Sequence, residues 1–203
     1  AAPTPVIQEI EENQELYPFY NQLSDEDKAV YNKICTTAQN FDETAASIYI
    51  GKTEKEVNDY VDDFVDFYRE VIYEQTDLFW VDPYSFNTTI WSEENKYTLD
   101  IKPIYLYTKE EASTMKKTFD AKVDEIVTNA EAKKSTYDEI LYVHDYIVEN
   151  CVYDDAAAAN DNYKGSSITA YGCLIDGKAI CSGYTMAFTT IMRELGYECG
   201  SEF

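Results

Sequence analysis

Apolar residues recur at three- and four-residue spacing in the first half of the chain, which predicts two amphipathic helices. One follows Ser24 and the other follows Thr53, and each of these residues precedes an acidic residue, Asp27 or Glu56, by three positions. This is the spacing of a capping box, so each helix is expected to begin directly after the hydroxyl residue. Residues 1–15 are polar and contain prolines, and we expect them to form a tether.

Three more helices are expected in the second half of the chain. The first, over 109–133, carries an apolar stripe and is charged elsewhere. The next runs from Ser135, as its N-cap, to about Asn150, and one predicted inward face holds Ile140, Leu141, His144, Ile147 and Val148. The last begins at Cys181 and ends where Gly196 takes the place of a C-terminal cap.

Strands are expected at two places. The stretches 85–91 and 96–107 have the composition of strands, and the polar segment between them indicates a hairpin loop. A second hairpin is predicted over 173–180, because Asp-Gly at 176–177 is a strong signal for a two-residue turn. The pattern therefore predicts an α+β class that is mostly helical with a small antiparallel β-element.

The charge of the chain excludes some classes of partner. Thirty-nine acidic residues against 16 basic ones give a formal net charge of −23, and a surface of this sign repels the phosphates of nucleic acids and of anionic membranes. No apolar run is long enough to span a membrane. We therefore expect neither a nucleic-acid partner nor a transmembrane segment, and we interpret the acidic surface as a solvated one.

Five cysteines and a single histidine limit the metal chemistry of the chain. No CxxC pair is present, so a structural zinc site is not expected. An odd number of cysteines leaves at least one thiol free if all pairing is intramolecular. Cys173 has Cys151 and Cys199 as alternative disulfide partners, and the sequence does not choose between them.

Cys181 falls at the amino terminus of the last predicted helix, where a cysteine has a chemical use. The unpaired N–H groups of a first helical turn and the helix dipole favour an anion, so a thiol placed there ionises more easily and becomes a better nucleophile. The same N–H groups are suited to stabilising an oxyanion. The alternative is a structural cysteine, which is the commoner role of this residue type.

The sequence around this cysteine resembles a known family. The stretch GKAICSGY at 177–184, followed by an apolar helix and by LGYEC at 195–199, is similar to the nucleophile segment of transglutaminase-like proteins, the papain-like superfamily of cysteine proteases and transglutaminases. Upstream, HDYIV at 144–148 and VYD at 152–154 resemble the helix and the step that precede the nucleophile in bacterial members. The resemblance spans about residues 135–199.

This resemblance implies a particular chemistry. Cys181 would attack a peptide or glutaminyl carbonyl and form a thioester, which water or an amine then releases, and this mechanism needs no cofactor. A peptide or protein is the implied substrate. The residues expected near the substrate cleft or the oxyanion are Tyr171, Gly172, Ser182, Gly183 and Tyr184.

One departure from the family pattern concerns the catalytic base. In the family, a His and an Asp follow the nucleophile helix by a few tens of residues, whereas this chain ends at Phe203 and its one histidine, His144, lies upstream. We expect His144 to be partly buried and hydrogen-bonded, in preference to a catalytic role. As a carboxy-terminally truncated domain, these residues alone are expected to have no substantial turnover.

Two other interpretations stand beside this one. In the first, a non-catalytic transglutaminase-like module holds a peptide or a cell-wall ligand in the same cleft, and Cys181 is a relic. In the second, Cys173 is the nucleophile. We rank the second lower, because Cys173 is predicted to lie in a strand with no helix terminus to activate it.

The full expectation is a mostly helical α+β fragment that contains the helical half of a transglutaminase-like domain. Residues 1–107 form an amino-terminal helical region with a β-hairpin, residues 108–199 form the incomplete core, and residues 200–203 resemble a cloning scar. The start of the chain and the bacterial resemblance favour an extracellular or cell-surface protein. The face left bare by missing strands offers a surface for dimerisation.

Overall fold

The computed structural model describes residues 6–42, 46–94, 96–160 and 165–200. The amino-terminal half begins with four helices, α1 (Val6–Glu12), η1 (Gln14–Leu16), α2 (Pro18–Gln22) and α3 (Asp25–Asn40). It continues with β1 (Ala46–Gly51), α4 (Glu54–Glu74), β2 (Val81–Glu93) and β3 (Lys96–Tyr105).

The carboxy-terminal half is mostly helical. Its long helices are α5 (Lys109–Glu131), α6 (Thr136–Asn150) and α8 (Cys181–Glu194). Between α6 and α8 lie five short elements, β4 (Val152–Tyr153), α7 (Asp155–Ala158), the 3₁₀-helix η2 (Ser166–Ile168), the π-helix η3 (Gly172–Asp176) and β5 (Lys178–Ala179). The predicted α+β class with a predominance of helix is confirmed.

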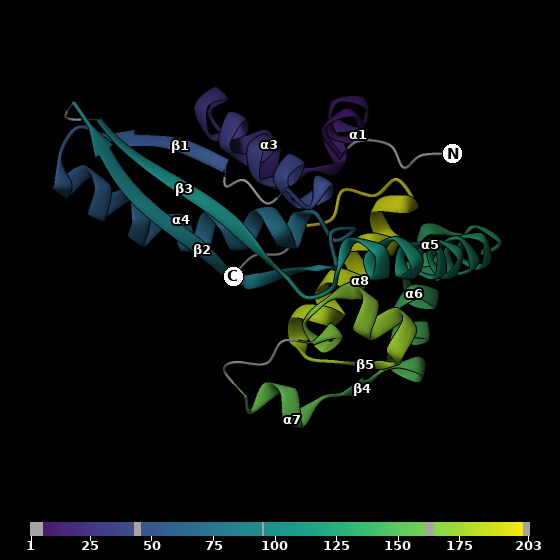
Figure 1. Cartoon of the computed structure of the whole chain (residues 1–203). Helices are drawn as coiled ribbons and strands as arrows, with labels where there is room; N and C mark the ends of the chain where they lie inside the picture. The colour runs from purple at the N-terminus through teal and green to yellow at the C-terminus, as the bar shows by residue number, and fades with distance from the viewer. Residues whose placement is uncertain (1–5, 43–45, 95, 161–164, 201–203) are drawn as a thin grey trace.

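The larger sheet is antiparallel, in the order β1-β3-β2, and α3 and α4 contact it (Figure 1). The hairpin predicted between the two strand stretches is confirmed, since Glu93 pairs with Lys96 at its tip. The end of this hairpin that carries the loop is largely exposed, whereas Leu99 and Ile101 of β3 are fully buried. The sheet therefore contributes to the core mainly through the part that α3 and α4 cover.

The long helices begin where the hydroxyl residues predict. Ser24, Thr53, Thr108 and Ser135 each accept a hydrogen bond from the backbone N–H of the third residue of the following helix. For α4 and α5, the side chain of the glutamate at that position accepts a hydrogen bond from the backbone N–H of the cap residue, which completes a capping box. These bonds lie within four residues of sequence, so they form independently of the tertiary structure.

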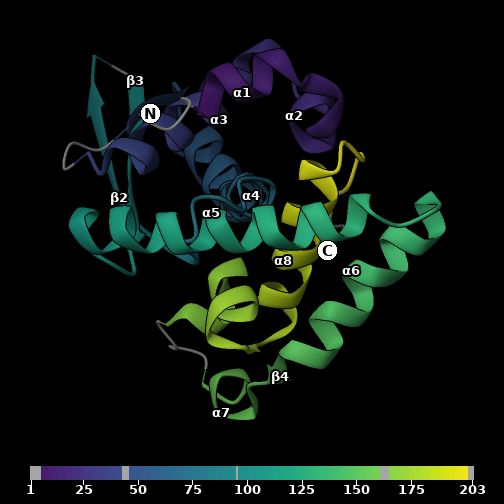
Figure 2. The same cartoon turned by 90° about the vertical axis from the view of Figure 1, so that its right-hand side faces the viewer.

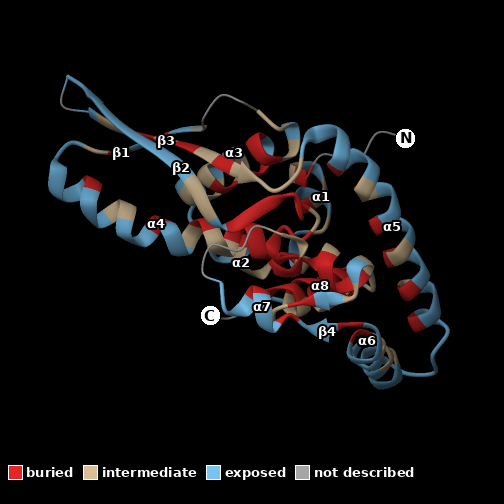
Figure 3. Ribbon diagram, turned by 60° about the horizontal axis from the view of Figure 1, so that its bottom comes forward, coloured by how far each residue is buried: buried red, intermediate tan, exposed pale blue. Residues whose placement is uncertain are grey.

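Helix α5 crosses the molecule, with α1 to α3 and the sheet on one side and α6, α7 and β4 on the other (Figure 2). Its predicted inward stripe is confirmed, because Ala112, Phe119, Val123, Ile126 and Ala130 are all buried. Helix α8 lies deeper still, and most of its ribbon is coloured as buried in Figure 3. None of the described helices has both the length and the apolar composition that crossing a bilayer requires.

Arg193, near the carboxyl end of α8, joins the two halves of the chain. Its Nη1 donates a hydrogen bond of 2.6 Å to the carbonyl of Glu74, and its Nε donates one of 3.2 Å to the carbonyl of Leu16. The guanidinium also lies 4.3 Å from the ring centre of Tyr17. The side chain is buried, so these contacts replace its hydration. The predicted boundary between residues 107 and 108 stays a prediction.

Replacing Arg193 by alanine is expected to lower the free energy of unfolding by about 3 kcal/mol, because one buried and one partly buried carbonyl lose a charged donor. Urea unfolding followed by circular dichroism measures this change. Lys55→Ala is the control, since Lys55 pairs with Asp59 on the exposed surface of α4 and its loss is expected to cost less than about 0.5 kcal/mol. Equal losses for the two variants would contradict the role assigned to Arg193.

The predicted tether at residues 1–15 is wrong for the part that the structure describes. Residues 6–12 form α1, in which Val6 and Ile10 are buried. The backbone N–H of Val6 donates to the side-chain oxygen of Gln39, and the Tyr17 hydroxyl donates to Glu9. Two apolar residues at four-residue spacing were enough to anchor a short helix on α3. Residues 1–5 and the suspected vector residues 201–203 lie outside the described chain.

The inward face predicted for α6 is also wrong. Ile140, Leu141 and Val148 are exposed, and Val143 and Ile147 are the buried residues of this helix. The covered side carries the partly buried rings of Tyr142 and Tyr146, and Lys133 lies over the Tyr142 ring at 4.1 Å. The apolar pattern alone does not predict this face, because two of the residues on it are tyrosines. Dimerisation through an exposed apolar face stays a prediction.

Two equal substitutions on α6 test this orientation. Val143→Ala removes two buried methyl groups and is expected to cost about 2 kcal/mol of unfolding free energy. Val148→Ala, on the exposed side, is expected to change it by less than about 0.5 kcal/mol. If urea denaturation ranks the two variants in the opposite order, α6 is rotated about its axis relative to the structure described here.

The hairpin predicted over 173–180 is wrong. Residues 172–176 form the π-helix η3, and Gly177 ends it with a left-handed φ of 68°. Lys178 and Ala179 then pair in parallel with Val152 and Tyr153. The Asp-Gly signal did identify a residue with positive φ, but a helix terminus uses the same conformation as a hairpin turn. Cys173 therefore lies in a helix and not in a strand.

Candidate active site

The candidate nucleophile opens helix α8. Cys181 is its first residue and is exposed, which is the position that the sequence predicted. The preceding residue, Ile180, takes the N-cap position and makes no side-chain cap. The backbone N–H groups of 181–183 form no hydrogen bond with any residue that the structure describes. The helix turn that carries the exposed thiol therefore has three backbone donors without a partner among the described residues.

This beginning differs from those of the other long helices. The helices α3 to α6 are each capped by a serine or threonine side chain, and even the short α7 is capped by Asp154. Loss of such a cap typically costs about 1 kcal/mol. An uncapped terminus in a chain that caps its other long helices is consistent with a site that accepts negative charge from outside the helix.

The segment before α8 fixes the position of this first turn. The N–H of Ile180 donates to the carbonyl of Ser167 at 2.9 Å, and the hydroxyl of Ser182 donates to the carbonyl of Ile168 at 3.2 Å. Ser182 was a candidate for the cleft, but its side chain is buried. It attaches the start of α8 to η2, and only its backbone N–H remains for an oxyanion.

Gly172 and Gly183 allow three backbone segments to pack closely. A Cβ atom on Gly172 would lie 2.3 Å from the carbonyl oxygen of Ser166. One on Gly183 would lie 2.7 Å from the carbonyl oxygen of Ser167 and 2.9 Å from that of Thr169. The short helix η2 is thus held between η3 and α8. Both glycines were predicted as cleft residues, and the structure shows that their lack of a side chain is needed for packing.

Asp154 ties the same segment to the strand pair. Its carboxylate accepts hydrogen bonds from the Ser167 hydroxyl at 2.7 Å and the Ala157 N–H at 3.1 Å, and it pairs with the Lys178 ammonium at 2.9 Å. The bonds from Ser167, Lys178 and Ala157 lower the pKa of Asp154 to about 2. Lys178 is three residues before Cys181, so Asp154 links the loop after α6 to the approach of α8.

The two tyrosines predicted near the cleft lie in different surroundings. Tyr171 packs against the rings of Phe79 and Phe119, at centroid distances of 4.9 and 6.3 Å. Tyr184 lies one turn after Cys181, and its hydroxyl donates to the carbonyl of Cys151 at 2.8 Å. Residues three apart on a helix are neighbours on its surface, so the partly exposed Tyr184 borders the thiol. Tyr171 belongs mainly to the packing of α5.

His144 is exposed, so the prediction that it is partly buried is wrong. Its Nδ1 lies 3.0 Å from Oδ1 of Asp145, the neighbouring residue on α6, and both side chains are more than half exposed. No hydrogen bond joins it to Cys181 within the described chain. No group of three or more potential metal ligands occurs among the described residues.

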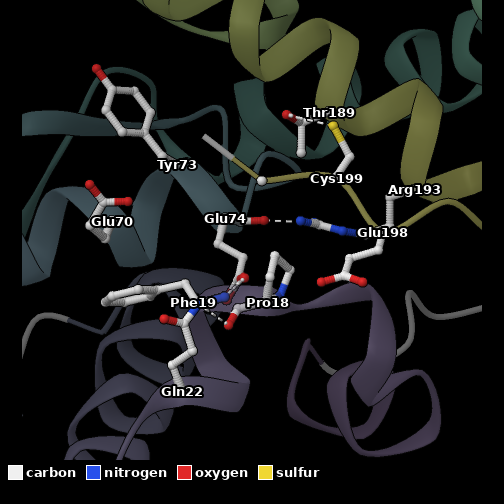
Figure 4. Close-up of a pocket in the computed structure, with 11 residues that line it drawn as sticks. Pro18, Phe19, Gln22, Glu70, Tyr73, Glu74, Thr189, Arg193, Glu198 and Cys199 are labelled. Atoms are coloured by element: carbon white, nitrogen blue, oxygen red, sulfur yellow. Dashed lines mark hydrogen bonds between the residues drawn. The ribbon is translucent and has the colours of Figure 1, made fainter. Parts of the chain in front are cut away.

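A cavity of about 710 Å³ lies at the other end of α8, beside α2 and α4 (Figure 4). Three carboxylates and Arg193 line it, and burial raises the pKa values of Glu70 and Glu74. Cys181 does not line this cavity. Twelve residues of helix separate Cys181 from Arg193, which is roughly 18 Å at the helical rise per residue. The cavity is therefore separate from the candidate nucleophile.

Comparison with known families assigns the carboxy-terminal part of the chain to one family. The family described as the transglutaminase-like superfamily matches residues 120–201. This part of the chain, from within α5 to the end of α8 and beyond, is therefore a transglutaminase-like domain, as the resemblance predicted. No protein in the curated comparison matches the chain significantly.

The sequence missed how the turn before Cys181 is held in place. Tyr153-Asp154 was noted only as part of the resemblance, and the partners Ser167 and Lys178 are 13 and 24 residues further along the chain. No local pattern connects them. One signal was present and unused: an isoleucine precedes the nucleophile helix where a serine or threonine precedes the others.

Replacing Asp154 by asparagine tests this anchor through the pH dependence of stability. Because the pKa is lower in the folded chain than the value near 3.9 of an unfolded aspartate, the ionised carboxylate stabilises the fold above about pH 4. That contribution is lost as the pH falls from about 4 to 2. The difference in melting temperature between the wild type and Asp154→Asn should therefore shrink over this interval.

The neighbouring Asp155→Asn is the matched control, because Asp155 is exposed at the start of α7. The melting temperature of Asp155→Asn is expected to differ little from that of the wild type, and this difference should be nearly constant with pH. A pH-independent difference for Asp154→Asn as well would show that the carboxylate charge does not anchor the segment.

Proposed function

We propose that this domain catalyses acyl transfer with Cys181 as the nucleophile. The Cys181 sulfur attacks the carbonyl carbon of a peptide or glutaminyl group, the C–N bond breaks and the amine leaves with a proton. The resulting thioester is then released by water, as in a peptidase, or by a second amine, as in a transglutaminase. This proposal deepens the family assignment, which by itself fixes neither the reaction nor the residue.

The observation that carries the proposal is the bare first turn of α8. An exposed thiol lies at the first helical position, no side chain caps the turn, and the N–H groups of 181–183 have no partner among the described residues. The partial positive charge of a helix amino terminus attracts negative charge, which suits an attacking sulfur at this position. When the carbonyl oxygen becomes negative in the tetrahedral intermediate, the same N–H groups are suited to stabilise it.

The described residues supply no base to Cys181. His144 is the single histidine of the chain, and it is exposed on α6 beside Asp145. Loss of one member of a catalytic triad lowers turnover by several orders of magnitude and leaves a slow residual reaction. We infer that these 203 residues alone acylate at Cys181 but release the acyl group slowly. Action on peptides outside the cell is the setting that the bacterial resemblance supports.

Reaction with p-nitrophenyl acetate tests this proposal. The ester transfers its acetyl group to the Cys181 sulfur and releases p-nitrophenol, which absorbs visible light when ionised. We expect about one equivalent of p-nitrophenol and little afterwards, with the acetyl group located at Cys181 by peptide mass spectrometry. Cys199, which is partly buried near the chain end and away from a helix start, is the internal control and should react more slowly.

The variant Ile180→Asp tests the role of the bare turn. An aspartate at the N-cap accepts the free N–H groups and places a negative charge beside the thiol, so acetylation of Cys181 is expected to slow about three- to tenfold. Ile180→Ser, which caps without charge, should have a smaller effect. Circular dichroism establishes whether both variants retain the fold.

Three results would contradict the proposal. Cys199 reacting as fast as Cys181 would favour the alternative of a non-catalytic module that binds a peptide or a cell-wall ligand. An unchanged rate in folded Ile180→Asp would show that the helix terminus does not activate the thiol. Rapid steady turnover by the chain alone would show that a base outside the family pattern serves Cys181.

A further inference from the structure

Two of the five cysteines lie against each other in the carboxy-terminal half. Cys151 is the residue that ends α6, and Cys173 is the second residue of η3. Both are free and buried, with 5% and 3% of their surface exposed. Burial, and then the nearby Cys151, raise the pKa of the Cys173 thiol.

The backbone holds these two positions together without help from the thiols. Immediately after Cys151, the N–H of Val152 donates to the carbonyl of Gly177 at 3.0 Å, and Val152 pairs with Lys178 in the parallel strands. A Cβ atom on Gly177 would lie 2.9 Å from the carbonyl oxygen of Asn150. Contacts that do not involve sulfur therefore hold the residues on either side of Cys151 against Gly177 and Lys178, which directly follow η3.

We propose that Cys151 and Cys173 are a disulfide site, which closes when the chain folds in the presence of a small-molecule disulfide such as oxidised glutathione. The Cys173 or Cys151 thiolate attacks the small disulfide, forms a mixed disulfide and releases one small thiol. The other protein thiolate then attacks the mixed disulfide, so that the protein S–S bond forms and a second small thiol leaves. Two protein thiols are oxidised and one small disulfide is reduced.

The other cysteines are not placed for such a bond. Cys35 is fully buried in α3, and the ionisable groups that interact with it are tyrosines and Glu74. Cys199 contacts the hydroxyl of Thr189 at 3.8 Å. No contact between described residues joins Cys35, Cys181 or Cys199 to another cysteine. One bond between residues 151 and 173 therefore leaves Cys181 free for acyl transfer.

The bond would close the segment that positions the start of α8. Residues 151–173 contain Asp154 and Ser167, and Ser167 accepts the hydrogen bond from Ile180. Closing a loop of this length lowers the conformational entropy of the unfolded chain and so stabilises the folded state. Burial of both sulfurs slows their exchange with reductants once the fold has formed. The inference does not depend on the proposed acyl transfer.

Refolding under two redox conditions tests the proposal. The chain is denatured and reduced, then refolded either with reduced and oxidised glutathione or with dithiothreitol, and free thiols are alkylated before non-reducing digestion. We expect a peptide that joins Cys151 to Cys173 only in the glutathione sample, with Cys35 and Cys181 recovered as alkylated thiols. The oxidised sample is expected to melt about 5–10 °C higher than the reduced one.

The variants separate the bond from other redox effects. Cys173→Ala should abolish the difference in melting temperature between the two conditions, whereas Cys35→Ala, which also alters a buried thiol, should retain it. The proposal is overturned if folded protein from the glutathione sample has both thiols alkylated. It is equally overturned if Cys151 or Cys173 pairs with another cysteine, or if the melting temperature of the wild type does not depend on the redox condition.

Discussion

The close packing of η2 between two glycines is the constraint on which the candidate site depends. The backbone of residues 166–169 passes so near Gly172 and Gly183 that neither position has room for a Cβ atom. Hydrogen bonds from Ile180 and Ser182 attach the first turn of α8 to the same segment. With the next two residues of the helix buried in this contact, Cys181 is left as the exposed residue of the turn.

Polar interactions complete this arrangement at both ends of α8. Asp154 holds Ser167 and Lys178 at the amino end, and Arg193 donates to carbonyls of the amino-terminal half at the carboxyl end. Both side chains are buried. Asp154 is paired with Lys178 and hydrogen-bonded, and two nitrogens of Arg193 donate to carbonyl oxygens. Between these anchors the first N–H groups of the helix have no side-chain cap, which costs stability. A cost of this kind is consistent with N–H groups that remain available to a substrate.

The sequence predicted those parts of the structure that are fixed by neighbours along the chain. Helices α3, α4 and α6 were predicted from a cap and a partner three residues apart, and α5 and α8 were predicted from their apolar period. The parallel pairing of β4 with β5 was missed, because its two strands are 26 residues apart and only two residues long. The phase of α6 was missed because its inner side combines Val143 and Ile147 with two partly buried tyrosines, whereas Ile140, Leu141 and Val148 are exposed.

The candidate site divides in the same way. Cys181 at a helix terminus followed from a local change of period, whereas Asp154 acquires its role from partners that only the tertiary fold brings to it. Gly172 and Gly183 were predicted to lie near the substrate cleft, and the structure shows that the backbone of the chain itself packs against them. A sequence pattern shows that a glycine is needed and does not show what packs against it.

The central claim is that the start of α8 makes Cys181 more reactive than an ordinary thiol. The most direct measurement is the rate of its alkylation by iodoacetamide at neutral pH, read by peptide mass spectrometry and compared with an unstructured peptide of residues 178–185. The account predicts that Cys181 in the folded chain reacts faster than the same cysteine in the peptide. Equal rates, or a slower reaction of the folded chain, would contradict it.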